Sequence, residues 1–216
     1  MPQHVVANGA GVGARDRSAS HADDLLQDLA SFGLHAQKKS FLYQERSLEK
    51  REEFLKRVQQ IAPAARVYID EAGVEDTLSS AYGWSRKGTR CLGERLGHRT
   101  CRISMIAAWC QKQVLAPCTY QGYCDSLLVE TWFEKCLLPV LKKGQVVILD
   151  NASFHRQAPL RALLQRVGCE LLPLPPYSPD FNKIEPLWNT LKRKIEKDNR
   201  NYSDFWDKVD AAFCSL

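Results

Sequence analysis

The run Val146-Val-Ile-Leu149, followed directly by Asp150, decides the fold class. Four consecutive branched aliphatic residues predict a strand buried on both faces, as in an α/β sheet covered by helices. A second apolar run, Arg66-Val-Tyr-Ile-Asp70, also ends in an aspartate. Open α/β sheets bind their ligands at the carboxyl ends of strands, so Asp70 and Asp150 are candidate functional residues. The alternative is that each aspartate only caps a turn.

Strands and helices alternate along the rest of the chain. Further strands are expected at 103–109, 114–120 and 169–174, from β-branched and apolar runs. Amphipathic or apolar patterns predict helices at 47–61, 125–141, 157–167, 185–197 and 203–213. This order predicts an α/β fold with a mixed five-stranded sheet flanked by helices.

Composition divides the chain into three regions. Residues 1–22 are rich in Gly, Ala, Ser and Arg without a sustained hydrophobic period, which is typical of disorder. Residues 23–61 carry two helical patterns, at 23–33 and 47–61, and residues 62–216 carry the α/β domain. The glycines at 9, 11 and 13 do not have the spacing of a dinucleotide-binding loop.

The formal net charge of +5 is concentrated in one stretch. Between residues 86 and 102 a single acid, Glu94, accompanies six cations: Arg86, Lys87, Arg90, Arg95, Arg99 and Arg102. The rest of the chain therefore sums to zero. A local basic stretch favours contact with a polyanion, and a solvated hairpin surface is the alternative.

Several classes of protein are excluded by what the sequence lacks. No apolar run approaches the roughly 18 residues of a membrane span, and no signal peptide opens the chain, so a cytoplasmic location is expected. The eight cysteines have neither C-x-x-C nor zinc spacing, so neither disulfides nor zinc are expected. The chain also lacks the G-x-S-x-G elbow of acyl-transfer enzymes and the Walker loop of nucleotide-hydrolysing enzymes.

Glu185 is a third candidate acid, at the start of an expected helix after a proline-rich loop. A capping box with Asn182, or a helix that starts at Pro186, would explain its position equally well. Three converging carboxylates without a paired base suit hard divalent cations. Two Mg²⁺ ions about 3.5–4 Å apart suit in-line phosphoryl displacement. A glycosidase pair is possible in principle, but the chain lacks an aromatic-rich groove signature.

Three segments resemble the catalytic motifs of the DDE transposases of the mariner superfamily, in their bacterial insertion-sequence branch. They are Tyr68-Ile-Asp70-Glu-Ala-Gly73, Leu149-Asp150-Asn-Ala-Ser-Phe-His155 and Pro175-Pro-Tyr-Ser-Pro-Asp-Phe-Asn-Lys-Ile-Glu185-Pro-Leu-Trp188. Thirty-four residues separate Asp150 from Glu185, the spacing typical of that branch. The resemblance runs from about Leu25 to the carboxyl terminus.

The resemblance implies an RNase H-like fold in which the strands that carry Asp70 and Asp150 are neighbours. Asp70, Asp150 and Glu185 would be the catalytic triad and would bind two Mg²⁺ ions, with Mn²⁺ able to substitute. The implied reaction is cut-and-paste transposition: hydrolysis at each transposon end liberates a 3′-OH, which attacks target DNA, typically at TA. The resemblance also implies a homodimer in the active complex, a bacterial cytoplasm with nucleoid association, and no membrane partner.

Further residues are candidates for DNA contact. They are Arg86, Lys87, Arg90, His155, Lys183, Lys192 and Arg193. Lys183 stands where the family usually has proline. For the cations the alternative is a solvated surface, and for His155 it is a hydrogen bond at the start of a helix. Trp84 and Trp109 can stack on flipped bases, although core packing is the favoured interpretation.

Full-length relatives carry two helix-turn-helix modules, and residues 24–39 resemble only the tail of the second. We therefore expect the catalytic part of a split or truncated transposase, with a separately encoded DNA-binding part as a further partner. The alternative is an inactive DNA-binding or dimerising fragment that modulates a full-length transposase.

Overall fold

The computed structural model describes residues 43–77, 83–93, 97–98, 101–198 and 200–216. The expected disordered segment at 1–22 and the expected helix at 23–33 lie outside these residues. Within residues 42–216 the chain forms one compact unit, which carries all the strands and helices described below.

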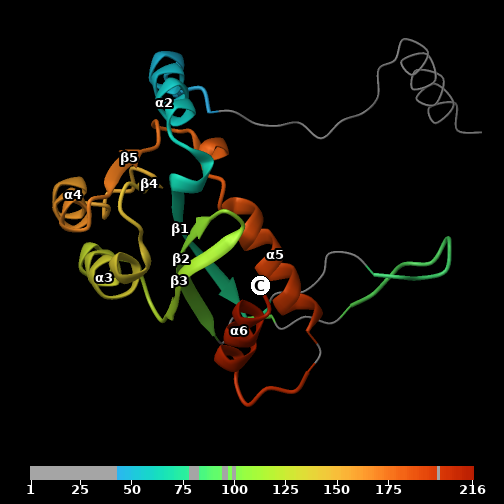
Figure 1. The fold of residues 1–216 in the computed structure, drawn as a ribbon. Coiled ribbons are helices and arrows are strands. Elements are labelled where there is room, and N and C mark those ends of the chain that lie inside the picture. The colour runs from blue at the N-terminus through green and yellow to red at the C-terminus, as the bar shows by residue number, and fades with distance from the viewer. Residues whose placement is uncertain (1–42, 78–82, 94–96, 99–100, 199) are drawn as a thin grey trace, which may run out of the picture. The chain divides into compact units, whose positions relative to one another are not determined.

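Five strands form a single mixed sheet in the order β3-β2-β1-β4-β5 (Figure 1). The strands are β1 (Arg66–Glu75), β2 (Arg102–Cys110), β3 (Gln113–Tyr120), β4 (Val146–Leu149) and β5 (Glu170–Pro173). β2 is antiparallel to both β1 and β3, whereas β4 is parallel to both β1 and β5. The fold class expected from the sequence is confirmed.

Helices cover both faces of the sheet. In Figure 1, α3 and α4 lie to the left of the sheet, and α5 and α6 lie to its right. The helices are α2 (Leu48–Gln60), α3 (Ser126–Trp132), α4 (Gln157–Arg166), α5 (Glu185–Lys197) and α6 (Phe205–Cys214). Short 3-10 turns occur at η1 (Pro63–Ala65), η3 (Leu138–Val140) and η4 (Pro179–Phe181). Because helices cover both faces of the sheet, both faces of β4 are buried, and this explains why β4 is apolar throughout.

Each face of the sheet has its own hydrophobic core. The core under α3 and α4 includes the fully buried side chains of Val147, Phe133 and Leu164. The core under α5 and α6 includes Ile148 and Leu191, and α2 contributes Phe54 to it. The alternation of Val147 and Ile148 between the two cores follows from the two-residue period of a strand.

The helix expected over 125–141 is not a single regular helix. α3 ends at Trp132 and continues as a π-helical turn, η2 (Phe133–Leu137), before the 3-10 turn η3. Pro139 offers a physical reason, because it has no N–H group and its ring clashes with the carbonyl four residues earlier. The apolar side chains of η2 still face the core, so the buried pattern in the sequence is preserved.

β1 is longer than the sequence analysis predicted, because it continues through Asp70 to Glu75. β4 pairs only with residues 66–68 of β1, but β2 pairs with β1 from Tyr68 as far as Glu75. The expectation that Asp70 ends its strand is therefore wrong, and the antiparallel partner is the reason. Asp70 nevertheless lies just beyond the last residue of β1 that pairs with β4.

All eight cysteines are free thiols, and Cys110 and Cys169 are buried as small apolar side chains. Among the described residues, no helix is long and apolar enough to cross a bilayer.

We predict that Ile148→Ala will lower the free energy of unfolding by about 2–5 kcal/mol, because it leaves a cavity in the core under α5. Ile148 is 0% exposed, whereas Leu127 on α3 is 71% exposed and provides the matched control. Urea denaturation of Leu127→Ala should differ from wild type by no more than about 0.5 kcal/mol. Equal losses in the two variants would contradict this assignment of the core.

Candidate active site

The parallel pairing of β1 with β4 brings two aspartates together. Tyr68 pairs with Ile148 in register, and two residues beyond each of them the chain reaches Asp70 and Asp150. Parallel neighbours lie about 4.8 Å apart across a sheet, so the two carboxylates start from adjacent backbone positions. The charge of Asp150 contributes to raising the pKa of Asp70, as expected for two neighbouring acids.

Asp70 is a desolvated carboxylate that faces α5. The indole N–H of Trp188 donates a hydrogen bond of 3.0 Å to Asp70 Oδ2. Burial, followed by the charge of Glu71, raises the pKa of Asp70 to about 7, although the Trp188 hydrogen bond opposes the rise. A carboxylate in such surroundings is stabilised in its charged form by a bound cation. The donor set at this position therefore fits a hard divalent metal.

Asp150 is held by the residues that follow it. Its Oδ1 accepts a hydrogen bond of 3.0 Å from the backbone N–H of Ala152, and it lies 2.7 Å from Nδ1 of His155. Burial acts to raise the pKa of Asp150, but the His155 and Ala152 hydrogen bonds outweigh it and the pKa is lowered. Half of the Asp150 side chain is exposed, at 50%, so it remains accessible to a ligand.

His155 bridges two acids beneath the site. Its Nε2 lies 3.0 Å from Glu71 Oε1, while its Nδ1 faces Asp150. Burial acts to lower the pKa of His155. The hydrogen bonds to Asp150 and Glu71 outweigh this effect and raise the pKa to about 9. His155 thus links β1 to the turn after β4, and its two acidic partners favour the protonated form of its ring. Its side chain is only 2% exposed, and its contact with DNA stays a prediction.

Asn182 anchors the proline-rich loop to β1. Its side-chain N–H donates a hydrogen bond of 3.1 Å to the carbonyl of Ile69, the residue directly before Asp70. Its Oδ1 lies 3.5 Å from the backbone N–H of Ile184, the residue that precedes α5. Because Asn182 is buried, these bonds fix the start of α5 against the strand that carries Asp70.

Glu185 is the first residue of α5 and is exposed. The capping-box alternative is wrong, because Ile184 is the N-cap and no side chain caps the helix. Trp188 lies one turn later, so Glu185 starts on the helix face that reaches Asp70. Among the described residues, no three His, Cys, Asp or Glu side chains are close enough to hold a metal ion. The structure thus places Asp70 and Asp150 on neighbouring strands. Glu185 lies at the start of the adjacent helix, but its side chain does not complete a three-carboxylate cluster with them.

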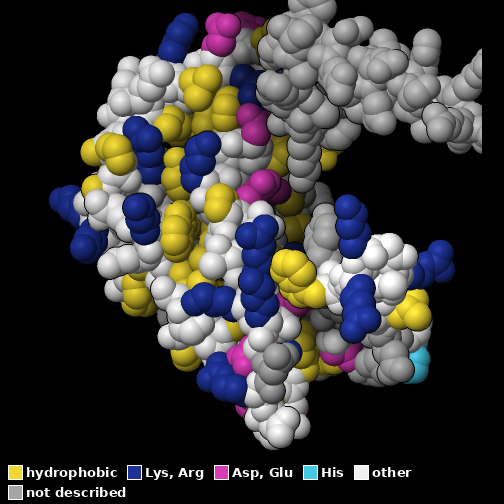
Figure 2. Space-filling view, turned by 90° about the vertical axis from the view of Figure 1, so that its right-hand side faces the viewer, with side chains coloured by type: hydrophobic (Ala, Val, Ile, Leu, Met, Phe, Trp, Pro, Cys, Tyr) yellow, Lys and Arg dark blue, Asp and Glu magenta, His cyan; other side chains and the backbone are white. Residues whose placement is uncertain are grey.

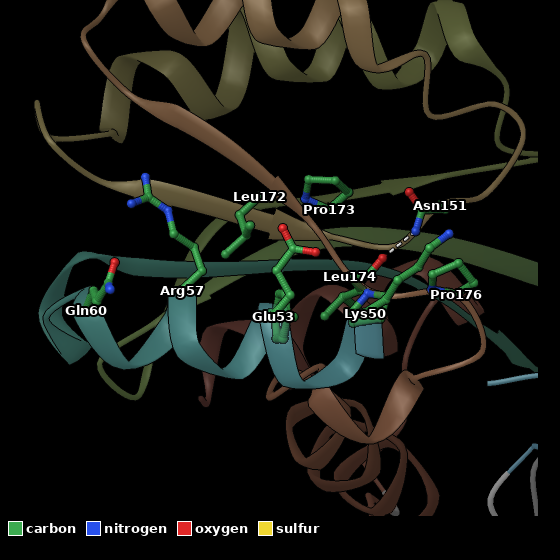
Figure 3. A pocket seen from close by; sticks show the side chains of 11 residues that line it. Lys50, Glu53, Arg57, Gln60, Asn151, Leu172, Pro173, Leu174 and Pro176 are labelled. Atoms are coloured by element: carbon green, nitrogen blue, oxygen red, sulfur yellow. Dashed lines mark hydrogen bonds between the residues drawn. The ribbon is translucent and has the colours of Figure 1, made fainter. Parts of the chain in front are cut away.

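Two adjoining cavities open beside Asp150. One, of about 520 Å³, is lined by Asp150, Tyr43, Tyr177 and the proline-rich loop. The other, of about 710 Å³, lies between α2 and the end of β5 (Figure 3). Asn151 lines both cavities, and Figure 3 shows its side chain bonded to the carbonyl of Leu174. Space for a ligand therefore extends from Asp150 along the loop towards α2.

The sequence matches the family described as DDE superfamily endonuclease over residues 65–207. The matched region spans β1 to the first residues of α6 and contains Asp70, Asp150 and Glu185. The chain belongs to this DDE endonuclease family. No curated protein gives a significant match to the sequence.

Solved structures share the fold of this DDE endonuclease. The Mos1 strand transfer complex has a TM-score of 0.66 at 15% identity, covering 98% of this chain and 74% of that chain. The Mos1 paired-end complex with the left transposon end has a TM-score of 0.63 at 14% identity, covering 99% and 76%. The catalytic domain of Mos1 mariner transposase has a TM-score of 0.53 at 13% identity, covering 83% and 86%. The RNase H-like architecture is thereby established.

The candidate DNA-contacting cations of the DDE endonuclease differ in their surroundings. Arg86, Lys87, Arg90, Lys183 and Arg193 are exposed, whereas Lys192 is half-buried. The amine of Lys183 lies 3.5 Å from the carbonyl of Asp180, so it is partly held by its own loop. Arg102 pairs with Glu75 at 3.4 Å, and residues 95 and 99 lie outside the described part of the chain.

Trp84 is completely exposed, so the favoured expectation that it packs in the core is wrong. It precedes a turn at residues 86–89, in which the backbone N–H of Thr89 donates to the carbonyl of Arg86 at 3.0 Å. Trp109 on β2 does pack against the core under α5, as expected.

Sequence reasoning missed three residues that shape the site: Glu71, Trp188 and the anchoring role of Asn182. Each of them stands inside a motif that was recognised for another residue. Strand alternation was the available signal for Glu71. It places the side chain of Glu71 on the other face of β1 from that of Asp70, where His155 contacts it. No sequence signal joins Asn182 to Ile69, because the contact spans 113 residues.

We predict that Asn182→Ala will lower the free energy of unfolding by about 1–3 kcal/mol, because it leaves the buried carbonyl of Ile69 without its donor. Asn189 is exposed on α5 and provides the matched control. Thermal or urea unfolding of Asn189→Ala should stay within about 0.5 kcal/mol of wild type. An Asn182→Ala protein as stable as Asn189→Ala would show that the anchor has no energetic role.

Proposed function

We propose that this chain is the catalytic domain of a DDE transposase of the mariner superfamily, in its bacterial insertion-sequence branch. It would cleave DNA strands at transposon ends and join the liberated 3′-OH to target DNA. The observation that carries the proposal is the alignment of Asp70 with Asp150 across β1 and β4, inside a domain of the DDE endonuclease family. The three motifs and the spacing of Glu185 supply the transposase assignment.

Asp70, Asp150 and Glu185 would hold two Mg²⁺ ions, for which Mn²⁺ can substitute. Such ions supply Lewis-acid polarisation of the scissile phosphate and charge stabilisation in an in-line displacement. The raised pKa of Asp70 supports the fit, because burial and like charge leave this carboxylate in need of a cation. Glu185 is exposed, so its side chain can turn towards the two aspartates without leaving a packed position.

The surrounding residues keep the acids ready for this role. His155 holds Asp150 ionised and oriented through a contact of 2.7 Å, and Glu71 in turn holds His155. Trp188 fixes the orientation of Asp70 from the first turns of α5. Because these partners are preorganised, the acids need little rearrangement when DNA arrives.

DNA is the proposed substrate, as transposon ends and as a target that contains TA. The names of the similar structures include paired-end and strand transfer complexes of Mos1. A homodimer is proposed from the resemblance of the three motifs to the transposase family. Figure 2 shows lysine and arginine side chains spread over one face of the molecule. Exposed cations of this kind bind phosphates without reading base sequence. A separately encoded DNA-binding part is proposed as a further partner that recognises the ends.

We predict that the chain will nick DNA only with Mg²⁺ or Mn²⁺ and that Asp70→Asn, Asp150→Asn and Glu185→Gln will each reduce the rate by at least about 100-fold. The reason is that each change removes a metal-binding carboxylate. The measurement is nicking of supercoiled plasmid, with and without EDTA. Glu52→Gln, an exposed acid on α2, is the control and should retain the wild-type rate.

Unchanged nicking in Asp150→Asn would contradict the proposal. Salt-sensitive DNA binding by a wild-type chain that never cleaves would also contradict it, and would favour the inactive fragment that modulates a full-length transposase.

We further predict that the triple variant Arg86→Gln, Lys87→Gln, Arg90→Gln will bind DNA with a weaker dependence on salt. Three lost phosphate contacts should reduce the slope of log K against log salt by roughly 2–3. The matched control replaces three exposed lysines where β3 and β4 begin: Lys112, Lys142 and Lys143. An equal change of slope in the two triple variants would show that the basic stretch is not a specific part of the DNA-binding surface.

A further inference from the structure

Two exposed tyrosines line the same cavity as Asp150. Tyr43 and Tyr177 are 54% and 55% exposed, and both line the cavity of about 520 Å³. Their ring centroids are 5.8 Å apart with an interplanar angle of 45°. The two rings therefore contact each other, yet more than half of each side chain is open to a ligand. An exposed aromatic pair next to a catalytic carboxylate is a feature that the proposed hydrolysis does not itself explain.

The proline-rich loop forces the ring of Tyr177 outwards. Tyr177 has a φ of +54°, in the left-handed region that residues other than glycine rarely adopt. Its neighbour Ser178 is buried, with a hydroxyl that donates to the carbonyl of Pro176 at 3.1 Å. Unfavourable backbone conformations of this kind persist where the surrounding structure enforces them, and they concentrate at functional sites.

Tyr43 is also held in place. The guanidinium of Arg46 donates a hydrogen bond of 2.8 Å to the carbonyl of Tyr43, and the backbone N–H of Arg46 donates to the same carbonyl. This turn leads directly into α2, whose N-cap is Ser47. Both rings of the pair are thus carried on backbone that is fixed before a ligand binds.

A cation completes the same hollow. The cavity with the tyrosines and the cavity under α2 share four lining residues: Asn151, Leu174, Pro175 and Pro176. Lys50 lines the second cavity, and Figure 3 shows its side chain pointing towards Asn151. Lys50 makes no ion pair with any residue that the structure describes, whereas Arg57, further along α2, pairs with Glu170 at 2.9 Å.

Aromatic faces next to a cation suit one class of ligand at a DNA-cleaving centre. Proteins bind single-stranded nucleic acid by stacking its bases on aromatic rings and holding its backbone with positive charge. In a duplex the bases already stack on each other, so their faces are not available to a tyrosine. The combination therefore favours an unpaired nucleotide over a paired one.

We propose that Tyr177, supported by Tyr43, stacks on the unpaired base of a nucleotide that flanks the scissile phosphate, while Lys50 binds the phosphate of that nucleotide. This inference rests on the proposed function and adds to it a site for a locally opened strand. The base is gripped through its face, so the site accepts any of the four bases.

The test measures binding of a DNA duplex with a short unpaired flap that carries 2-aminopurine, whose fluorescence falls when it stacks. Titrations are made without divalent ions, so no cleavage is required. Wild type should quench the probe and should bind this flap about tenfold more tightly than a flap whose probe base is replaced by an abasic site. Tyr177→Asn removes the ring while tolerating a positive φ, so it should lose the quenching and about tenfold in affinity. Tyr177→Phe keeps the ring and should behave as wild type.

Three controls make the result specific. On the abasic flap, wild type and Tyr177→Asn should bind equally, because no base is left to stack. Lys50→Gln should weaken binding of both flaps by the same factor, because its partner is a phosphate. Tyr123→Ala removes another tyrosine, 97% exposed after β3, and should change nothing.

Full quenching by Tyr177→Asn, or an equal loss of affinity on the abasic flap, would overturn the inference. Because binding is read without metal, a wild type that quenches the probe but never nicks DNA would refute only the proposed cleavage. A wild type that nicks DNA but does not distinguish the two flaps would refute only the stacking site.

Discussion

The site depends on one constraint, the parallel hydrogen bonding of β4 to the first three residues of β1. This register decides that Asp70 and Asp150 emerge at the same place on the sheet. It is stable because Val147 and Ile148 are buried in separate cores on the two faces of β4. A slip of one residue would exchange these faces and would turn each side chain of the strand towards the wrong core. Core packing therefore sets the position of the acids.

Polar contacts then bring the rest of the site to this pair. Asn182 ties the proline-rich loop to the carbonyl before Asp70, and Trp188 reaches from α5 to the carboxylate itself. On the opposite face, His155 joins Glu71 to Asp150. The contacts of Asn182, Trp188 and His155 with β1 each span more than 80 residues, so the site forms only in the folded domain. In this endonuclease the acids therefore come together only when the domain folds, and an isolated segment would not form the site.

Much of this could be predicted from sequence, because the strong signals are local. β4 and α5 have the bounds expected from an apolar run and from an amphipathic pattern behind a proline loop. The extension of β1 past Asp70 was missed because Glu71, Ala72 and Gly73 are weak strand formers, and their pairing with β2 decides the outcome. The exposure of Trp84 was missed for a related reason. A hydrophobic residue in a sequence does not reveal whether a partner surface exists to cover it.

The most direct test of the central claim measures the binding of Mn²⁺ to the intact chain without DNA. Electron paramagnetic resonance reports the concentration of the ion that remains free. We predict that wild type binds Mn²⁺ and that Asp70→Asn and Asp150→Asn each weaken this binding by roughly tenfold or more. Binding of equal strength by wild type and both variants would contradict this prediction, because the aligned aspartates would then not be the metal site.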